Sequence, residues 1–143
     1  MRPSTLAEVV RRSRGDGTWQ HHLDEFLDVF YGRDGDLASQ DACIRDNPGL
    51  LGSDRADAFI GGTGEHLARR WNLPIPRWVR DEARYLTQAM FVPDEKRLRA
   101  VLIAASPVAF RSRLIFTGPD PLQRASFPYH RGVVGLPSKG RAA

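Results

Sequence analysis

Apolar residues recur along the first half of the chain at the three- and four-residue spacing that is typical of amphipathic helices. The clearest stretch runs from Thr18 to Gly32, where leucines and aromatic residues recur at i, i+3, i+4, i+7 and i+8 and so share one helix face. A shorter helix is expected before it, because Thr5 and Glu8 have the spacing of a capping box and an apolar face follows as far as Arg14. The apolar positions of the longer helix are Leu23, Phe26, Leu27, Phe30 and Tyr31.

Two further helices are predicted before residue 72. A weaker one covers residues 37–46 and stops before Asn47-Pro48, because the residue that precedes a proline disfavours helical backbone. Ser53 can cap a longer helix that reaches Trp71 and contains three glycines, each of which costs a helix up to ~1 kcal/mol relative to alanine. Glycines Gly61, Gly62 and Gly64 therefore indicate close approach by another backbone, or a local kink.

The segment 72–93 has no clean period and is expected to be irregular. Pro74 and Pro76 hold its backbone extended, and its aromatic residues are too numerous for a plain linker. We expect the segment to wrap the helical core with Trp78 and Phe91 buried.

Two helices separated by a proline break are predicted next. The first runs from about residue 94 to Ala105. Ser106 is a natural N-cap and Pro107 suits the first position of a second helix. The inward residues are expected to be Leu98, Val101, Leu102 and Ala105 of the first helix and Phe110, Leu114 and Ile115 of the second. The same spacing predicts that Arg111 and Arg113 are exposed.

These elements predict an all-α fold, with one compact domain of five or six helices over residues 1–125. The second, fourth and fifth helices are expected to form the core. Residues 126–143 are rich in glycine, proline and basic residues, and we expect a flexible basic tail there.

Composition narrows the location of the protein. No apolar run approaches the ~18 to 20 residues that a membrane span needs, and the first residues lack the apolar centre of a secretory signal. Cys43, the single cysteine, allows no internal disulfide, so a cytoplasmic protein is expected.

Charge is distributed unevenly behind the formal net charge of +4. Residues 15–58 hold ten acids against three arginines, whereas residues 64–143 hold fourteen bases against six acids. The two halves either neutralise each other across the fold or offer surfaces to charged partners. Five of the acidic residues are expected to form either a solvated face or a docking surface for a basic partner. They are Asp24, Glu25, Asp28, Asp34 and Asp36.

Catalytic and metal-binding patterns are weak. Residues 61–66 read Gly-Gly-Thr-Gly-Glu-His, but the lysine and the spacing of a phosphate-binding loop are absent. Glu65 and His66 could serve as an acid–base pair, yet neighbouring residues on a helix point about 100° apart. We expect His66 to pack against the segment 72–93 instead. No metal site and no cofactor are predicted, since the three-ligand spacing of a catalytic zinc site is missing.

Arginine accounts for nineteen of the 21 basic residues, and it favours planar recognition of carboxylate and phosphate groups. Arg111, Arg113 and Arg124 are the best phosphate-binding candidates. A second basic region is interleaved with tryptophans, a composition shared by nucleic-acid platforms and protein interfaces. Its members are Arg69, Arg70, Arg77, Arg80 and Arg84, with Trp71 and Trp78.

Four stretches carry a family resemblance, namely residues 26–31, 65–70, 73–78 and 106–116. They resemble a small family of uncharacterised bacterial proteins over roughly residues 18–125. The genes of that family often neighbour one for a nucleotidyltransferase-like protein, an arrangement typical of toxin–antitoxin pairs. Similar segments also follow helix-turn-helix domains in longer regulators, but these 143 residues contain no such pattern.

The resemblance implies a non-catalytic partner-binding protein, an antitoxin that occludes the active cleft of a nucleotidyltransferase-like toxin. An arginine placed where the toxin binds nucleotide phosphate would compete with its substrate. One alternative is a nucleic-acid-binding regulator that uses the basic C-terminal half. Another is a small enzyme that uses Glu65 and His66. The residues expected to contact a partner are Arg80, Arg84, Arg111, Arg113, Trp78 and Tyr85.

Overall fold

The computed structural model describes residues 1–128, and this part of the chain is mostly helical, as the sequence predicts. Its six α-helices are α1 (Leu6–Asp16), α2 (Trp19–Gly32), α3 (Leu37–Arg45), α4 (Asp54–Arg70), α5 (Arg99–Ala105) and α6 (Val108–Arg111). Three short 3-10 helices are η1 (Arg77–Arg80), η2 (Glu82–Arg84) and η3 (Lys96–Leu98). Two-residue strands, β1 (Met90–Phe91) and β2 (Ile115–Phe116), pair in parallel.

Side-chain caps explain where the helices begin. The hydroxyl of Thr5 accepts a hydrogen bond from the Glu8 amide at 3.0 Å, so α1 starts where the capping-box spacing predicts. Ser53 caps α4 in the same way through the Ala56 amide at 3.4 Å. Gly17 ends α1 with a φ of 72°, a left-handed conformation that glycine adopts without steric cost.

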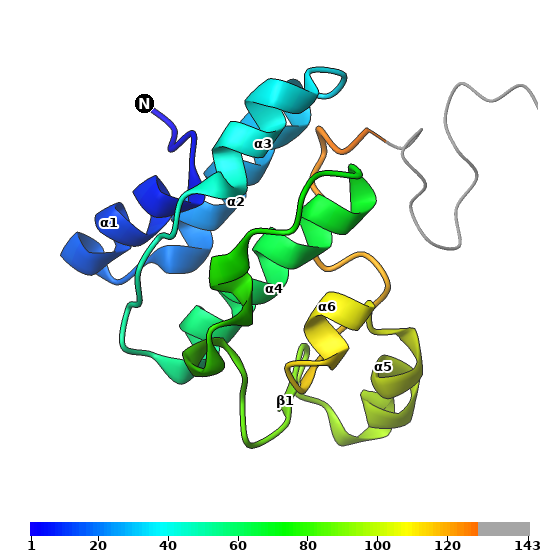
Figure 1. Cartoon of the computed structure of the whole chain (residues 1–143). Helices are drawn as coiled ribbons and strands as arrows, with labels where there is room; N and C mark the ends of the chain where they lie inside the picture. The colour runs from blue at the N-terminus through cyan, green and yellow to red at the C-terminus, as the bar shows by residue number, and fades with distance from the viewer. Residues whose placement is uncertain (129–143) are drawn as a thin grey trace, which may run out of the picture.

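Helix α4 runs through the middle of the molecule (Figure 1). Helices α1, α2 and α3 lie on one side of it, whereas α5 and α6 lie beyond its other side. Edge-to-face contact between the rings of Phe30 and Trp71, 5.2 Å apart, joins α2 to the end of α4. Leu6, Val9 and Val10 from α1 complete this part of the core.

The helix expected after Pro107 is much shorter than predicted. It ends at Arg111, and Leu114 then adopts a φ of 63° before the chain enters β2. Ser106 is not its N-cap, because the Ser106 hydroxyl donates to the Leu102 carbonyl and accepts from the Thr117 amide at 2.8 Å. Beyond residue 111, Ile115 is buried as predicted and Leu114 is half-buried, whereas Arg113, expected to be exposed, is buried.

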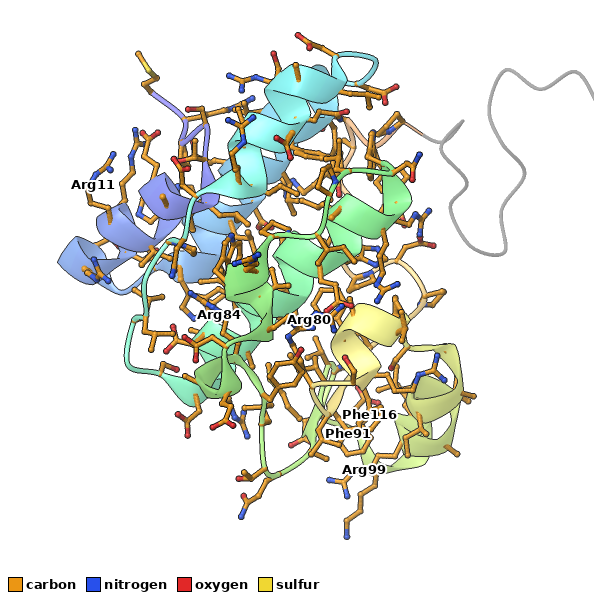
Figure 2. The ribbon with its side chains drawn as sticks, in the orientation of Figure 1. Arg11, Arg80, Arg84, Phe91, Arg99 and Phe116 are labelled. Carbon is orange, nitrogen blue, oxygen red and sulfur yellow. The ribbon has the colours of Figure 1, made fainter. Side chains whose placement is uncertain are left out.

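The part of the chain around α5 contributes less to the core than predicted. Leu102 is buried but lies outside the main core cluster, and Val101 is 63% exposed rather than inward. Helix α6 supplies Phe110 to the core instead. Phe91 is half-buried, because it stacks on Phe116 with ring centres 5.2 Å apart at the edge of the fold (Figure 2).

The packed structure extends past the boundary expected at residue 125. Phe127 is buried and its ring lies 5.0 Å from that of Tyr31, edge to face. The rest of the predicted tail, residues 129–143, lies outside the described residues. Among the described helices, none is long and apolar enough to cross a membrane.

Candidate functional site

The segments that carry the predicted site residues pack against one face of α4, the face that bears its glycines. A Cβ atom at Gly61 would lie 3.0 Å from the side chain of Arg84, and one at Gly64 would lie 2.7 Å from the indole of Trp78. A Cβ atom at Gly62 would likewise lie 2.8 Å from the Phe110 ring. The expected close approach is therefore present, but its nearest atoms belong to side chains.

Arg113 lies inside the protein, so the prediction that it is exposed is wrong. Its guanidinium donates to the Glu65 carboxylate at 2.8 Å and to the Ala109 carbonyl at 2.6 Å. It also donates to the Val79 carbonyl and lies 4.5 Å from the centre of the Tyr85 ring. Arg113 and Tyr85 thus come together, as an internal contact and not as a binding surface.

Arg84 is a second buried arginine. Its guanidinium donates to the Asp57 carbonyl at 3.2 Å and to the Gly49 carbonyl at 2.8 Å, and it lies over the Trp78 ring at 4.7 Å. Trp78 is buried too, as expected for the fold, and its indole N–H donates to the Ile44 carbonyl at 2.9 Å. Neither Arg84 nor Trp78 is placed to serve as the main contact of a docked partner.

The six predicted contact residues differ in their exposure to solvent. Arg80 and Arg111 are exposed and Tyr85 is half-buried, whereas the other three are buried. The physical reason is that η2 and the turn after α6 point Arg84 and Arg113 toward α4.

Glu65 does not have the surroundings of a general acid or base. Burial would raise its pKa, but hydrogen bonds from Arg113 and Arg69 outweigh that effect and hold the pKa below its ordinary value. The carboxylate accepts from Arg113 on one oxygen and from Arg69 on the other, each at 2.8 Å. Both oxygens are engaged by structural partners.

His66 is buried, and its ring centre lies 5.7 Å from that of Phe110 on α6. The expected contact between His66 and the segment 72–93 stays a prediction. Burial, together with the charge of Arg70, lowers the pKa of His66 to about 4. The imidazole is therefore neutral at pH 7. In the described part of the chain, no three His, Cys, Asp or Glu residues are grouped to hold a metal ion.

The acidic and basic parts of the sequence meet at α2. Arg124 pairs with Asp28 at 3.0 Å and with Asp24 at 3.6 Å, about a hundred residues away in the chain. The Arg124 hydrogen bond lowers the pKa of Asp28. Arg124, predicted as a phosphate-binding candidate, is thus engaged with carboxylates of α2, in line with charge neutralisation across the fold.

An open groove of about 700 Å³ lies between the end of α3 and η1, and it is lined largely by basic and polar residues. Arg77 and Arg80 are exposed, and neither forms an ion pair with the residues that the structure describes. Side chains at i and i+3 of a 3-10 helix are eclipsed, so these two guanidiniums project from one side of η1. The groove residues are Arg45, Asn47, Pro76, Arg77, Trp78, Arg80 and Asp81.

Two of the three arginines in the groove were not predicted from the sequence as contact residues. Arg77 was only one member of a broad basic region, and Arg45 was assigned no role. The sequence Pro76-Arg77 with a further arginine three residues later, Arg80, could have indicated a short turn with paired cations. Arg45 carries no such local signal, because the fold alone brings α3 to η1.

Comparison with known proteins yields no matching family model, no matching curated relative and no matching solved structure.

Proposed function

We propose that this protein is a non-catalytic binding protein that docks a macromolecular partner through the groove beside η1. The observation that carries the proposal is the pair Arg77 and Arg80, two exposed cations on one side of a short helix at the mouth of an open groove of about 700 Å³. Cations that lack an internal carboxylate are available to a partner's anionic groups.

The shape and chemistry of the groove favour a protein partner with an acidic surface. Half-buried Pro76 gives apolar contact area next to the arginines, and the buried Trp78 lies behind it. Arginine is enriched where protein interfaces concentrate their binding energy. Asp81 and Asn47 also line the groove. The Asp81 carboxylate can accept hydrogen bonds from a partner, and the Asn47 amide can both donate and accept them.

The family resemblance supplies a partner class for the same surface. In that arrangement the partner is a nucleotidyltransferase-like toxin, and the chain is its antitoxin. Arg77 and Arg80 would lie against the carboxylates or the phosphate-binding part of the toxin cleft and exclude its substrate. The expected partner is thus unchanged, but its contact surface is at Arg77 and Arg80 and not at the buried Arg113.

The surroundings of Glu65 and His66 support a non-catalytic role. Both Glu65 oxygens accept hydrogen bonds from arginines, and His66 is buried beside the Phe110 ring in its neutral form. A general acid or base needs a proton-transfer path to a substrate, which these contacts do not leave open.

Co-expression with the product of the adjacent gene tests the proposal. A tag on this chain is expected to retain the partner through gel filtration, and the partner's nucleotide-transfer activity is expected to fall when the complex forms. A lone monodisperse protein that retains no partner contradicts it.

A nucleic-acid partner is the second candidate, and the two exposed cations of η1 are what favour it. Its signature is affinity for single-stranded or duplex DNA or RNA that falls steeply with salt, because each neutralised phosphate releases a counterion. Absence of any binding at low salt removes this candidate.

A further inference from the structure

A pocket of about 220 Å³ lies on another part of the surface, where four segments that are distant in sequence meet. Helix α2 supplies one wall, Phe59 of α4 a second, and the β1 region and the segment 121–123 close the rest. Its lining residues are Trp19, Gln20, Leu23, Asp24, Leu27, Phe59, Met90, Val92, Pro121, Leu122 and Gln123.

The interior of this pocket is apolar. Leu23, Leu27 and Leu122 are buried and form its floor, and the rings of Trp19 and Phe59 lie 5.5 Å apart beside them. Engineered apolar cavities of about 150 Å³ stay dry and bind benzene. A pocket of about 220 Å³ therefore has room for one six-membered ring or a branched aliphatic group of similar size.

The mouth of the pocket carries a negative charge. Asp24 lines it with a side chain that is 52% exposed. The nearest cation, Arg124, lies closer to Asp28, at 3.0 Å, than to Asp24, at 3.6 Å. Arg124 donates its hydrogen bonds to Asp28, so the exposed Asp24 carboxylate at the mouth remains open to a further cation. Gln20 adds an amide at the same rim.

We propose that this pocket binds a small organic cation, an arylalkylamine whose ring enters the apolar interior while its ammonium group lies against Asp24. The ring loses its contact with water in the pocket, which supplies affinity. The carboxylate at the mouth supplies the preference for a positive charge. This inference is independent of the groove beside η1, because the two sites share no residue.

The test is a titration of the ¹⁵N-labelled protein with 2-phenylethylamine, followed by NMR, with 3-phenylpropionate as the matched anion and ethylbenzene as the uncharged ring. We expect shifts confined to the residues of the pocket, the Trp19 indole N–H among them. We also expect tighter binding of the amine than of the anion. No binding of the amine at millimolar concentration overturns the proposal, as does equal affinity for amine and anion.

Two variants separate the contributions of charge and shape. Asp24→Asn is expected to weaken the amine about threefold to fivefold, the size of an exposed ion-pair contribution, and to leave ethylbenzene unchanged. Glu25→Gln makes the same change at the next position of α2, outside the pocket lining, and is expected to leave both affinities unchanged. If the two variants behave alike, Asp24 does not select the cation and the proposal fails.

Met90→Trp tests the shape of the site, because a larger ring on this half-buried wall fills the pocket. Loss of binding of both the amine and ethylbenzene is expected. Undiminished binding in a folded Met90→Trp variant places the ligands elsewhere and contradicts the proposal.

Discussion

The guanidinium of Arg113 donates a hydrogen bond to the carboxylate of Glu65 at 2.8 Å, and both side chains are withdrawn from solvent. The pair joins the middle of α4 to the turn that follows α6. Removal of one partner from a buried ion pair leaves the other charge uncompensated, which costs more than the pair itself contributes. Glu65 and Arg113 are therefore stability residues, and their replacement acts on the fold before it acts on any partner.

Arg113→Ala is expected to lower the free energy of unfolding by about 3–5 kcal/mol. The buried Glu65 carboxylate would keep only the partly exposed Arg69, and the Ala109 and Val79 carbonyls would lose their buried donor. Urea unfolding followed by circular dichroism measures this. Arg111→Ala, at an exposed position of α6, is the control and is expected to change stability by less than about 0.5 kcal/mol. Equal effects of the two substitutions would contradict the buried position of Arg113.

Replacement of both members of the pair by apolar residues tests the same relationship differently. The variant Glu65→Leu with Arg113→Met is expected to be destabilised by less than the sum of the two single substitutions, since no unpaired charge remains. A double-mutant cycle from urea unfolding gives the coupling. Strict additivity would show that the two side chains do not interact.

Gly64→Ala is expected to destabilise the protein by about 1–3 kcal/mol, because the added methyl group would overlap the Trp78 indole at 2.7 Å. Gly15→Ala in α1 is the matched control, since nothing lies within 4 Å of its Cβ position. There the helix propensity of alanine is expected to leave stability unchanged or to raise it by up to about 1 kcal/mol. Thermal unfolding compares the two, and a stabilising Gly64→Ala would contradict the close packing.

The same α4 shows how much local sequence can predict. Ser53, the apolar periodicity and the glycines predict its start, its buried face and the close contacts along it. They do not predict which groups make those contacts, because Arg84 and Phe110 reach α4 from segments that are distant in sequence. Helix starts depend on neighbours within four residues, whereas packing partners depend on the whole fold.

Arg113 shows where sequence reasoning fails. A continuous helix advances 100° per residue, and on that assumption residues 111 and 113 lie on exposed positions. The helix stops at Arg111 and Leu114 takes a left-handed conformation, so the direction of Arg113 is set by that turn. The groove and the apolar pocket were also beyond prediction, since each joins segments whose proximity no local pattern encodes.

The protein is expected to lose stability as the pH falls from about 6.5 toward 4, in part through His66. In the unfolded chain this imidazole binds a proton near its ordinary pKa of 6.5, whereas burial lowers the folded-state pKa to about 4. Between these pH values the unfolded state binds more protons than the folded state. His66 therefore contributes up to about 3 kcal/mol to the free energy of unfolding above pH 6.5, and this contribution is lost as the pH falls to 4.

Unfolding free energies of the wild type and His66→Asn at several pH values measure this share. The variant is expected to have a lower melting temperature at pH 7 but a shallower decline between pH 6.5 and 4. An identical pH dependence would show that His66 is not buried in its neutral form. Partner binding is expected to survive in His66→Asn wherever the variant stays folded, and loss of a specific turnover in a stable variant would point to catalysis instead.

The groove beside η1 carries the central claim, and partner affinity measured on two charge-matched variants tests it most directly. Arg77→Glu with Arg80→Glu reverses both cations of η1, whereas Arg11→Glu with Arg97→Glu makes the same change at exposed positions outside the groove. Figure 2 labels Arg80 in the groove and Arg11 away from it. Titration calorimetry with the co-purified partner is expected to show at least a tenfold loss of affinity, about 1.4 kcal/mol, for the first variant and little change for the second. Equal affinities for the two variants, with both proteins folded, would contradict the claim that the partner docks at Arg77 and Arg80.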